Sequence, residues 1–176
     1  MLWGHRSGLR ASSRRREDEA VSLRDRVHGA VRRGEMSDEL ADLVENEPRA
    51  IRYLLGMSYH SDLVIRETAT RGVALASRYH PKLVQEAVRR LIWAMNDEAG
   101  TNALTAPAVL HAIASENPEL LLPMVPDLTR LAADPGLQEG IAKTLKTVAS
   151  RCPGKVGEIL GRSLNECRES LGEESL

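Results

Sequence analysis

Apolar residues recur along this chain with the period of amphipathic helices. The pattern is punctuated by four prolines, at positions 48, 81, 118 and 153. Apolar residues occupy the third, sixth and seventh places after each proline, which puts them on one helical face. They are Ile51, Leu54, Leu55, Val84, Ala87, Val88, Leu121, Met124, Val125, Val156, Ile159 and Leu160. The spacing predicts helices over about residues 48–59, 81–95, 118–132 and 153–170.

A second set of helices is expected before the prolines, over about residues 62–78, 103–116 and 136–151. Asn117 before Pro118 and Asp134 before Pro135 read as N-cap and first-turn pairs. Pro123 and Pro126 should kink or delay the helix that begins at Pro118. The expected core residues of this set are Ile65, Ala69, Val73, Ala76, Ala106, Leu110, Ile113, Ala114, Ile141, Leu145, Val148 and Ala149.

An Ala-Ser pair precedes three of the prolines, at residues 76–77, 114–115 and 149–150. The four prolines lie 33, 37 and 35 residues apart. Self-similarity at this period is typical of stacked helical repeats, whose units bury their apolar faces only against one another. The expected fold is all-α, a right-handed α-α superhelix of about four helix pairs over residues 37–170.

The ends of the chain are expected to differ from the repeats. Residues 1–16 contain five Arg and no acid. We expect a disordered basic tail or upstream sequence from an early start codon, and the alternatives are an arm for an anionic partner and an organelle-targeting peptide. Residues 17–36 form a capping helix, with acids Glu17–Glu19 leading and Gly34 ending it. Ser37 caps the next helix. Residues 171–176 form a C-terminal tail.

Composition and charge narrow the range of partners. The 176 residues are 42% hydrophobic and 28% charged, with 3% aromatic residues and no Phe. The net charge of −1 divides into about +5 over residues 1–33 and −6 over the rest. An acidic body disfavours binding to duplex nucleic acid, which needs concentrated Lys and Arg. No apolar run approaches the roughly 20 residues that span a bilayer, so no membrane partner is expected.

The two cysteines, Cys152 and Cys167, flank one predicted helix. Fifteen residues of helix would separate them by about 22 Å, too far for a disulfide. Reduced thiols favour a reducing compartment, and we expect a cytoplasmic protein.

The segment from Asp62 to Ala69, Asp-Leu-Val-Ile-Arg-Glu-Thr-Ala, resembles the second-helix signature of a HEAT repeat. The resemblance implies that Asp62 and Arg66 tie neighbouring repeats together. Later units lack the Arg-bearing segment, having Ala106-Pro107 and Ile141-Ala142 instead. These short repeats are most similar to the bilin-lyase-like (E-Z) class of HEAT units, and the match covers about residues 37–170. It indicates an armadillo-like fold more strongly than an activity.

The resemblance also implies that the helices before the prolines line a concave face. Residues expected to point outward there form a mixed, mildly basic stripe that suits a protein or peptide partner. Candidate binding residues on these helices are Arg66, Arg71, His111, Lys143 and Lys146, flanked by Glu67, Thr70, Arg78 and Thr147.

The most polar segment, residues 96–102, offers two further candidates, Asp97 and Glu98. They form either a ligand or metal loop or a solvated turn that caps the next helix. Trp93 nearby is either a packing residue or a stacking surface. The histidines show no metal-binding spacing, and no metal or cofactor is expected. No catalytic arrangement is evident, and Cys152 reads as a capping position.

Gly154, Gly157 and Gly161 interrupt the last predicted helix. Glycine is costly inside a helix, so another helix should approach closely there, from a neighbouring repeat or a second subunit. The oligomeric state itself is open.

Three functions remain for test. The first is a non-catalytic scaffold that binds a protein through the concave face. The second is a bilin-lyase-like enzyme or chaperone acting on a protein-bound cofactor. The third is nucleic-acid binding through the Arg-rich N-terminus.

Overall fold

The computed structural model describes residues 21–96 and 105–173, and over these ranges the chain is helical with no strand. For residue 164 and residues 166–173 only the helical backbone is described. The elements are α1 (Leu23–Arg32), α2 (Asp38–Asn46), α3 (Ala50–Met57), α4 (Leu63–Tyr79), α5 (Pro81–Asn96), α6 (Ala106–Glu116), the 3-10 helix η3 (Pro118–Met124), α7 (Val125–Leu131), α8 (Gln138–Arg151) and α9 (Pro153–Glu173).

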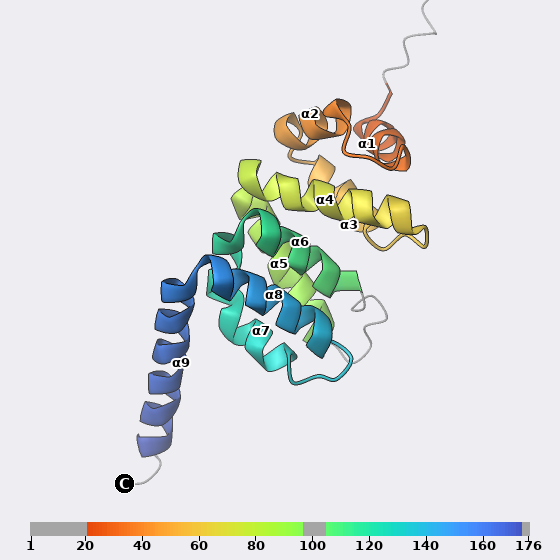
Figure 1. Ribbon diagram of the computed structural model, residues 1–176. Coiled ribbons are helices and arrows are strands. Elements are labelled where there is room, and N and C mark those ends of the chain that lie inside the picture. The colour runs from red at the N-terminus through yellow and green to blue at the C-terminus, as the bar shows by residue number, and fades with distance from the viewer. Residues whose placement is uncertain (1–20, 97–104, 174–176) are drawn as a thin grey trace, which may run out of the picture.

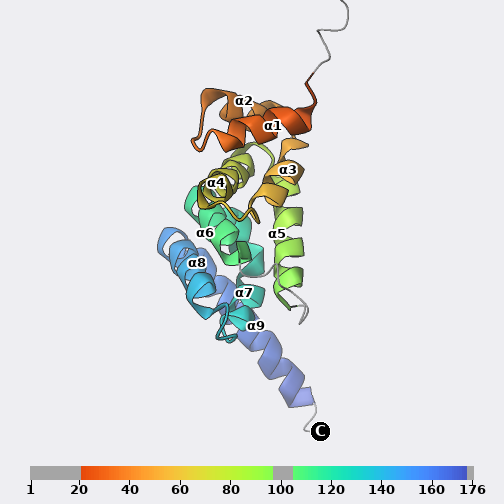
Figure 2. The ribbon, with the colours of Figure 1, turned by 90° about the vertical axis from the view of Figure 1, so that its right-hand side faces the viewer.

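The helices lie in two rows that follow the chain from one end of the molecule to the other (Figures 1 and 2). One row contains the helices that precede the prolines, and α2 packs on α4, α4 on α6 and α6 on α8. The other row contains α1, α3, α5, η3 with α7, and α9. Each helix of one row therefore alternates in sequence with a helix of the other.

Polar side chains define the starts of the first helices. The hydroxyls of Ser22 and Ser37 accept hydrogen bonds from the backbone N–H groups of Asp25 and Leu40. Asp62 accepts from the first turn of α4 in the same way. Such bonds satisfy donors that have no partner inside the helix. Gly34 ends α1 with a φ of 79°, as the sequence predicted.

The residue before each proline adopts the same backbone conformation. Its φ lies between −140° and −121° and its ψ between 52° and 87°. A following proline ring excludes the α region for the residue before it, so the helix ends there. The four residues are Glu47, His80, Asn117 and Cys152. The prolines thus occupy equivalent places in successive units.

Each proline also lacks the backbone N–H that could bond to a carbonyl at the end of the preceding helix. After α2 and after α4, a side chain from the next helix pair contacts that carbonyl instead. Pro48 and Pro81 have no N–H to offer the carbonyls four residues earlier, which belong to Val44 and Ser77. His80 Nε2 lies 3.1 Å from the Val44 carbonyl oxygen. Asn117 Nδ2 donates to the Ser77 carbonyl oxygen at 2.9 Å. The residue that ends one helix therefore completes the hydrogen bonding of the preceding unit.

The next junction uses different side chains. Cys152 stands where His80 and Asn117 stand in the earlier units, and the neighbouring Arg151 donates to the Ser115 carbonyl instead. Two ion pairs also cross between units, Arg78 with Glu116 and Lys155 with Glu119, the second at 2.7 Å. Both ion pairs are exposed to solvent and therefore contribute little. The contacts from His80, Asn117 and Arg151 to backbone carbonyls fix the alignment of successive helix pairs more strongly than these ion pairs do.

Two predicted side-chain caps are wrong, although a helix does begin at Pro118. Asn117 makes no side-chain cap for the helix at Pro118, because its amide is directed back to Ser77. Asp134 does not cap α8, which begins at Gln138, and its carboxylate accepts from the N–H of Gly136 in the preceding turn.

Helix boundaries elsewhere are shifted by a few residues. The capping helix predicted over 17–36 begins at Leu23, because Ser22 caps it, and residues 1–20 lie outside the described residues. Helix α3 begins two residues after Pro48. Helix α9 runs to Glu173, beyond the predicted start of a C-terminal tail. Pro123 and Pro126 act as predicted, since the chain forms η3 before α7.

The buried core follows the predicted apolar faces in α3 to α8. Leu54, Leu110, Leu121 and Ile141 are fully buried. Departures occur at the edges. The predicted core residues that remain half-buried are Leu55, Ile65, Leu145, Ala149, Val156, Ile159 and Leu160. In the other direction, Thr70 was expected to point outward and is buried.

The glycines of α9 have no close neighbour. A Cβ atom added at Gly154, Gly157 or Gly161 would meet no heavy atom within 4 Å. The expectation that a neighbouring repeat approaches them is therefore wrong. The close approach occurs at Gly140 of α8 instead, where an added Cβ would lie 2.5 Å from the Cβ of Pro107 on α6.

We predict opposite effects of alanine at two helical glycines. Gly140→Ala should destabilise the protein by about 1–3 kcal/mol, because its methyl group overlaps Pro107 where α6 and α8 pack. Gly157→Ala should stabilise it by up to about 1 kcal/mol, because the site is open and alanine favours the helix. Urea unfolding of the two variants measures both signs, and equal effects would contradict the packing described.

A double-mutant cycle should detect the bond between units at Ser77. Asn117→Ala should cost about 1 kcal/mol of unfolding free energy, since it leaves the Ser77 carbonyl without a donor. The cost should shrink in a Pro81→Ala background, where residue 81 regains the N–H that reaches this carbonyl.

Asn46→Ala is the matched control for the cycle. Its amide bonds only within its own helix, to the carbonyl of Asp42 at 3.2 Å, and is exposed. We expect a change within about 0.5 kcal/mol. A cost for Asn117→Ala that is the same with and without Pro81 would show that the Ser77 bond is not what Asn117 contributes.

Candidate functional site

Arg66, implied by the HEAT resemblance to bridge repeats, makes its contact within one unit. Its Nη1 atom donates to the His60 carbonyl at 3.1 Å, in the turn that leads into α4. Asp62 caps α4 at the N–H groups of Val64 and Ile65, at 2.9 and 3.2 Å. The implied roles of Asp62 and Arg66 between repeats are therefore not observed, and both residues shape the start of α4.

Besides Arg66, four predicted binding residues lie on the row of α4, α6 and α8. Arg71, Lys143 and Lys146 are exposed, while His111 is half-buried. Arg71 borders a shallow hollow of about 330 Å³ between α4 and α6 that Ala112 and Glu116 also line. Lys143 lies close enough to His111 to influence its charge. The structure thus brings part of the predicted basic stripe together on one face.

His111 is linked to the next unit. Its Nε2 lies 3.3 Å from the hydroxyl oxygen of Thr147 on α8. Partial burial, and then the positive charge of Lys143, hold the pKa of His111 below its ordinary value. The neutral ring is therefore the form that the folded state favours at this site.

The structure describes Trp93 but not the other two predicted binding residues, Asp97 and Glu98. Trp93 is 71% exposed on α5, so the packing interpretation is wrong for this residue. It belongs to the row opposite to that of Arg71 and His111. Asp97 and Glu98 lie outside the described residues.

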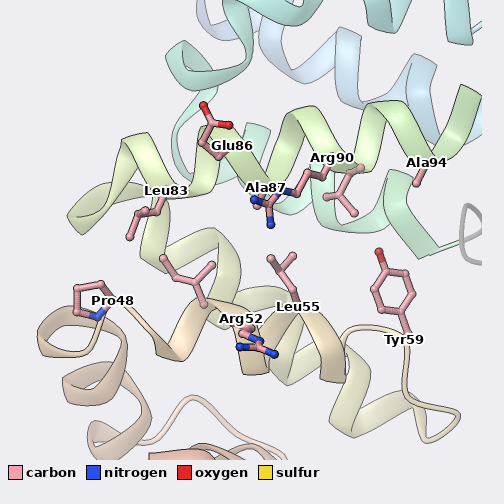
Figure 3. Close-up of a pocket in the computed structure, with 11 residues that line it drawn as sticks. Pro48, Arg52, Leu55, Tyr59, Leu83, Glu86, Ala87, Arg90 and Ala94 are labelled. Atoms are coloured by element: carbon pink, nitrogen blue, oxygen red, sulfur yellow. The ribbon is translucent and has the colours of Figure 1, made fainter.

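A groove lies between α3 and α5, and sequence reasoning missed it. Its volume is about 470 Å³. Figure 3 shows Leu83, Ala87 and Ala94 of α5 facing Pro48 and Leu55 across the gap. The full lining comprises Pro48, Ile51, Arg52, Leu55, Tyr59, Leu83, Glu86, Ala87, Arg90, Leu91 and Ala94. We call it the α3–α5 groove.

The groove exists because two neighbours in one row are not packed tightly together. In this row α1 packs on α3, and α5 on α7, but no comparable packing joins α3 to α5. Helix α3 has 8 residues and α5 has 16. Alanines at 87 and 94 of α5 are too small to fill the remaining space. Leu83, 48% exposed, is left at the rim.

Polar groups surround this apolar floor. Arg52 and Arg90 line the groove, and neither forms an ion pair with another described residue. Glu86 is the only carboxylate of the lining, and it pairs with Arg89 on the same helix. The phenol of Tyr59 lies toward the Ala94 end of the groove (Figure 3), and burial raises its pKa. Trp93 follows Arg90 by three residues on α5, which places it beside the groove.

Other kinds of site receive no support in the described part of the chain. No three His, Cys, Asp or Glu side chains there gather in a way that would hold a metal ion. Within the same residues, every helix is too short or too polar to traverse a bilayer. One feature of the sequence could have indicated the α3–α5 groove. Leu83 adds an apolar residue beside the face of α5 that packs in the core.

We predict that His111 titrates below the ordinary histidine pKa of about 6.5. As the pH falls, the unfolded chain takes up this proton first, so stability falls from about pH 7 down to the pKa of the folded state. Lys143→Met should raise the pKa, because it removes a nearby positive charge, whereas Lys146→Met should leave it nearly unchanged. Proton NMR of the ring measures both, and equal responses would contradict the geometry.

Comparisons with protein-family models, with curated proteins and with solved structures found no match for this chain. The resemblance to HEAT repeats therefore rests on the residues and the proline period alone. The function has to be argued from the surfaces of the chain itself.

Proposed function

We propose that this protein is a non-catalytic, HEAT-like helical scaffold that binds a short segment of a partner protein in the α3–α5 groove. The observation that carries the proposal is an open apolar groove of about 470 Å³ between two helices of one row. Pockets that recognise ligands are of this size, mostly apolar, with a few polar groups that orient the occupant.

The repeat part of the proposal is supported by the equivalent prolines. Four residues before a proline share one backbone conformation, and two of them bond back to the preceding unit in the same way. Such nearest-neighbour contacts are what an α-α superhelix of stacked helix pairs requires. Stacked pairs of this kind present long surfaces along both rows.

A partner segment suits the groove better than a reacting substrate. Among the lining residues, Arg52, Arg90 and Tyr59 recognise anionic or polar groups, while the single carboxylate, Glu86, is engaged by Arg89. The lining therefore lacks the acid–base pair that a bilin-lyase-like or other catalytic role would use. An apolar strip of Leu55, Leu83 and Leu91 is the kind of surface that receives a helix.

This site differs from the one expected from the sequence. Arg71, His111 and Lys143 lie on the opposite row, where Arg71 borders a smaller hollow. We place the binding function in the α3–α5 groove because apolar burial supplies most of the affinity of a peptide segment, and charged rim residues mainly tune the association rate.

The test is a selection of displayed random peptides on the folded protein. Peptides that bind the wild-type chain should lose at least about tenfold in affinity against Leu83→Asp, because a carboxylate then stands at the rim of the apolar strip. Leu63→Asp is the matched control, since Leu63 is 54% exposed on α4 and lies outside the groove.

The contrary outcome is equally specific. If the selected peptides bind Leu83→Asp as tightly as wild type but lose affinity for Lys143→Glu, the binding function belongs to the row of α4, α6 and α8. Circular dichroism of each variant confirms that the comparison is made between folded proteins.

A further inference from the structure

Helix α9 is the element that the body of the protein leaves least covered. It runs from Pro153 to Glu173 and packs on α7, α8 and η3. Its half-buried residues are in its first half, at Val156, Ile159 and Leu160. Both ribbon views show its last turns clear of every other helix (Figures 1 and 2). A helix that stands away from the body needs another surface to stabilise it.

The sequence of this second half is that of an amphipathic helix. Leu164, Cys167 and Leu171 follow one another at intervals of three and four residues. This spacing places apolar residues on one helical face. The same spacing occurs in amphipathic helices that bind in a hydrophobic groove.

The α3–α5 groove is long enough to receive this half of the helix. The groove extends along α5 from Leu83 to Ala94, an interval of 11 residues or about 16 Å of helix. The apolar positions of α9 beyond those packed on its own core extend from Leu164 to Leu171, an interval of 7 residues or about 10 Å. A helix laid along the groove would therefore bring all three apolar positions over the apolar floor.

The charges of the two surfaces are complementary. Residues 160–176 contain Glu166, Glu169, Glu173 and Glu174 against Arg162 and Arg168. The groove presents Arg52 and Arg90 without ion-pair partners among the described residues. An acidic helix beside these two guanidinium groups would acquire charge-assisted contacts that neither surface makes alone.

The occupant has to come from another molecule. Within one chain, α9 packs at the far end of the row, on α7, and α5 stands between α7 and the groove. The sequence of residues 1–16 contains five Arg and no acid, which is the wrong charge for Arg52 and Arg90.

We infer that the α3–α5 groove of one copy binds the second half of α9 from a second copy of this chain. This inference rests on the proposed binding function of the groove and names its occupant. The contact is heterologous, groove to helix, so two copies can exchange their α9 helices or add further copies in a row.

The first measurement is the mass of the full chain in solution. Light scattering coupled to size-exclusion chromatography should give a mass that rises above the 19.4 kDa of one chain as the concentration increases. Arg52→Glu/Arg90→Glu should return the mass to one chain, because the groove then repels the acidic helix. Glu166→Arg/Glu169→Arg should do the same from the other side of the contact.

A mixture of the two double variants provides the decisive control. Each variant repels itself, but the glutamates of the first groove face the arginines of the second helix, and the second groove and first helix keep their natural charges. Mixing should therefore restore the larger mass. A wild-type mass that stays at one chain, or a mixture that stays monomeric, overturns the inference.

A peptide experiment separates this inference from the proposed function. A synthetic peptide of residues 156–176, added to the Trp3→Phe protein, should change the fluorescence of Trp93 beside the groove, and Leu83→Asp should weaken that binding at least tenfold relative to Leu63→Asp.

Three results would contradict the inferred binding of α9 from a second copy, each in a different way. If this peptide fails to bind but selected peptides occupy the groove, the partner is another protein and only the self-association is wrong. If dodecanoate changes the Trp93 fluorescence and the peptide does not, the occupant is a small apolar acid. If nothing binds the groove, the proposed function fails as well.

Discussion

A proline directly after the end of a helix leaves that helix one hydrogen-bond donor short, and at two places a side chain from farther along the chain replaces the donor. The carbonyls of Val44 and Ser77 lose their donors to Pro48 and Pro81. His80 and Asn117, from the next unit, take their place. A local defect in the backbone is thus repaired only when the following unit is correctly positioned. At these two junctions, the hydrogen bonding at the end of one helix depends on residues that follow a later helix.

The same arrangement explains why the two rows differ. The cross-unit bonds join the C-terminal ends of α2, α4 and α6, so this row is held in close register. Gly140 allows α8 to approach Pro107 of α6 within the same row. The other row has no such bonds at α3 and α5, and the short α3 leaves part of the long α5 uncovered. The α3–α5 groove is a consequence of close packing on one side and looser packing on the other.

The groove and α9 together give the chain both an apolar recess and an unsupported apolar helix. Helical repeats normally cover their terminal faces with polar capping units. Here α9 carries an apolar spacing along its length while its last turns stand away from the body (Figure 1). The basic stripe around His111 and Lys143 is a separate surface on the opposite row, where charge rather than apolar area dominates.

The helical class, the apolar faces, the helix ends before the prolines and the helix start at Ser37 follow from local sequence alone. These features depend on interactions within a few residues: the spacing of Leu and Val, the ring of proline, and caps such as Ser37. Contacts between distant helices direct the amide of Asn117, leave Trp93 exposed to solvent and separate α3 from α5 at the groove. These outcomes depend on the distance between helices far apart in the chain, and the size of Ala87 or the length of α3 has meaning only once a neighbouring helix is in place.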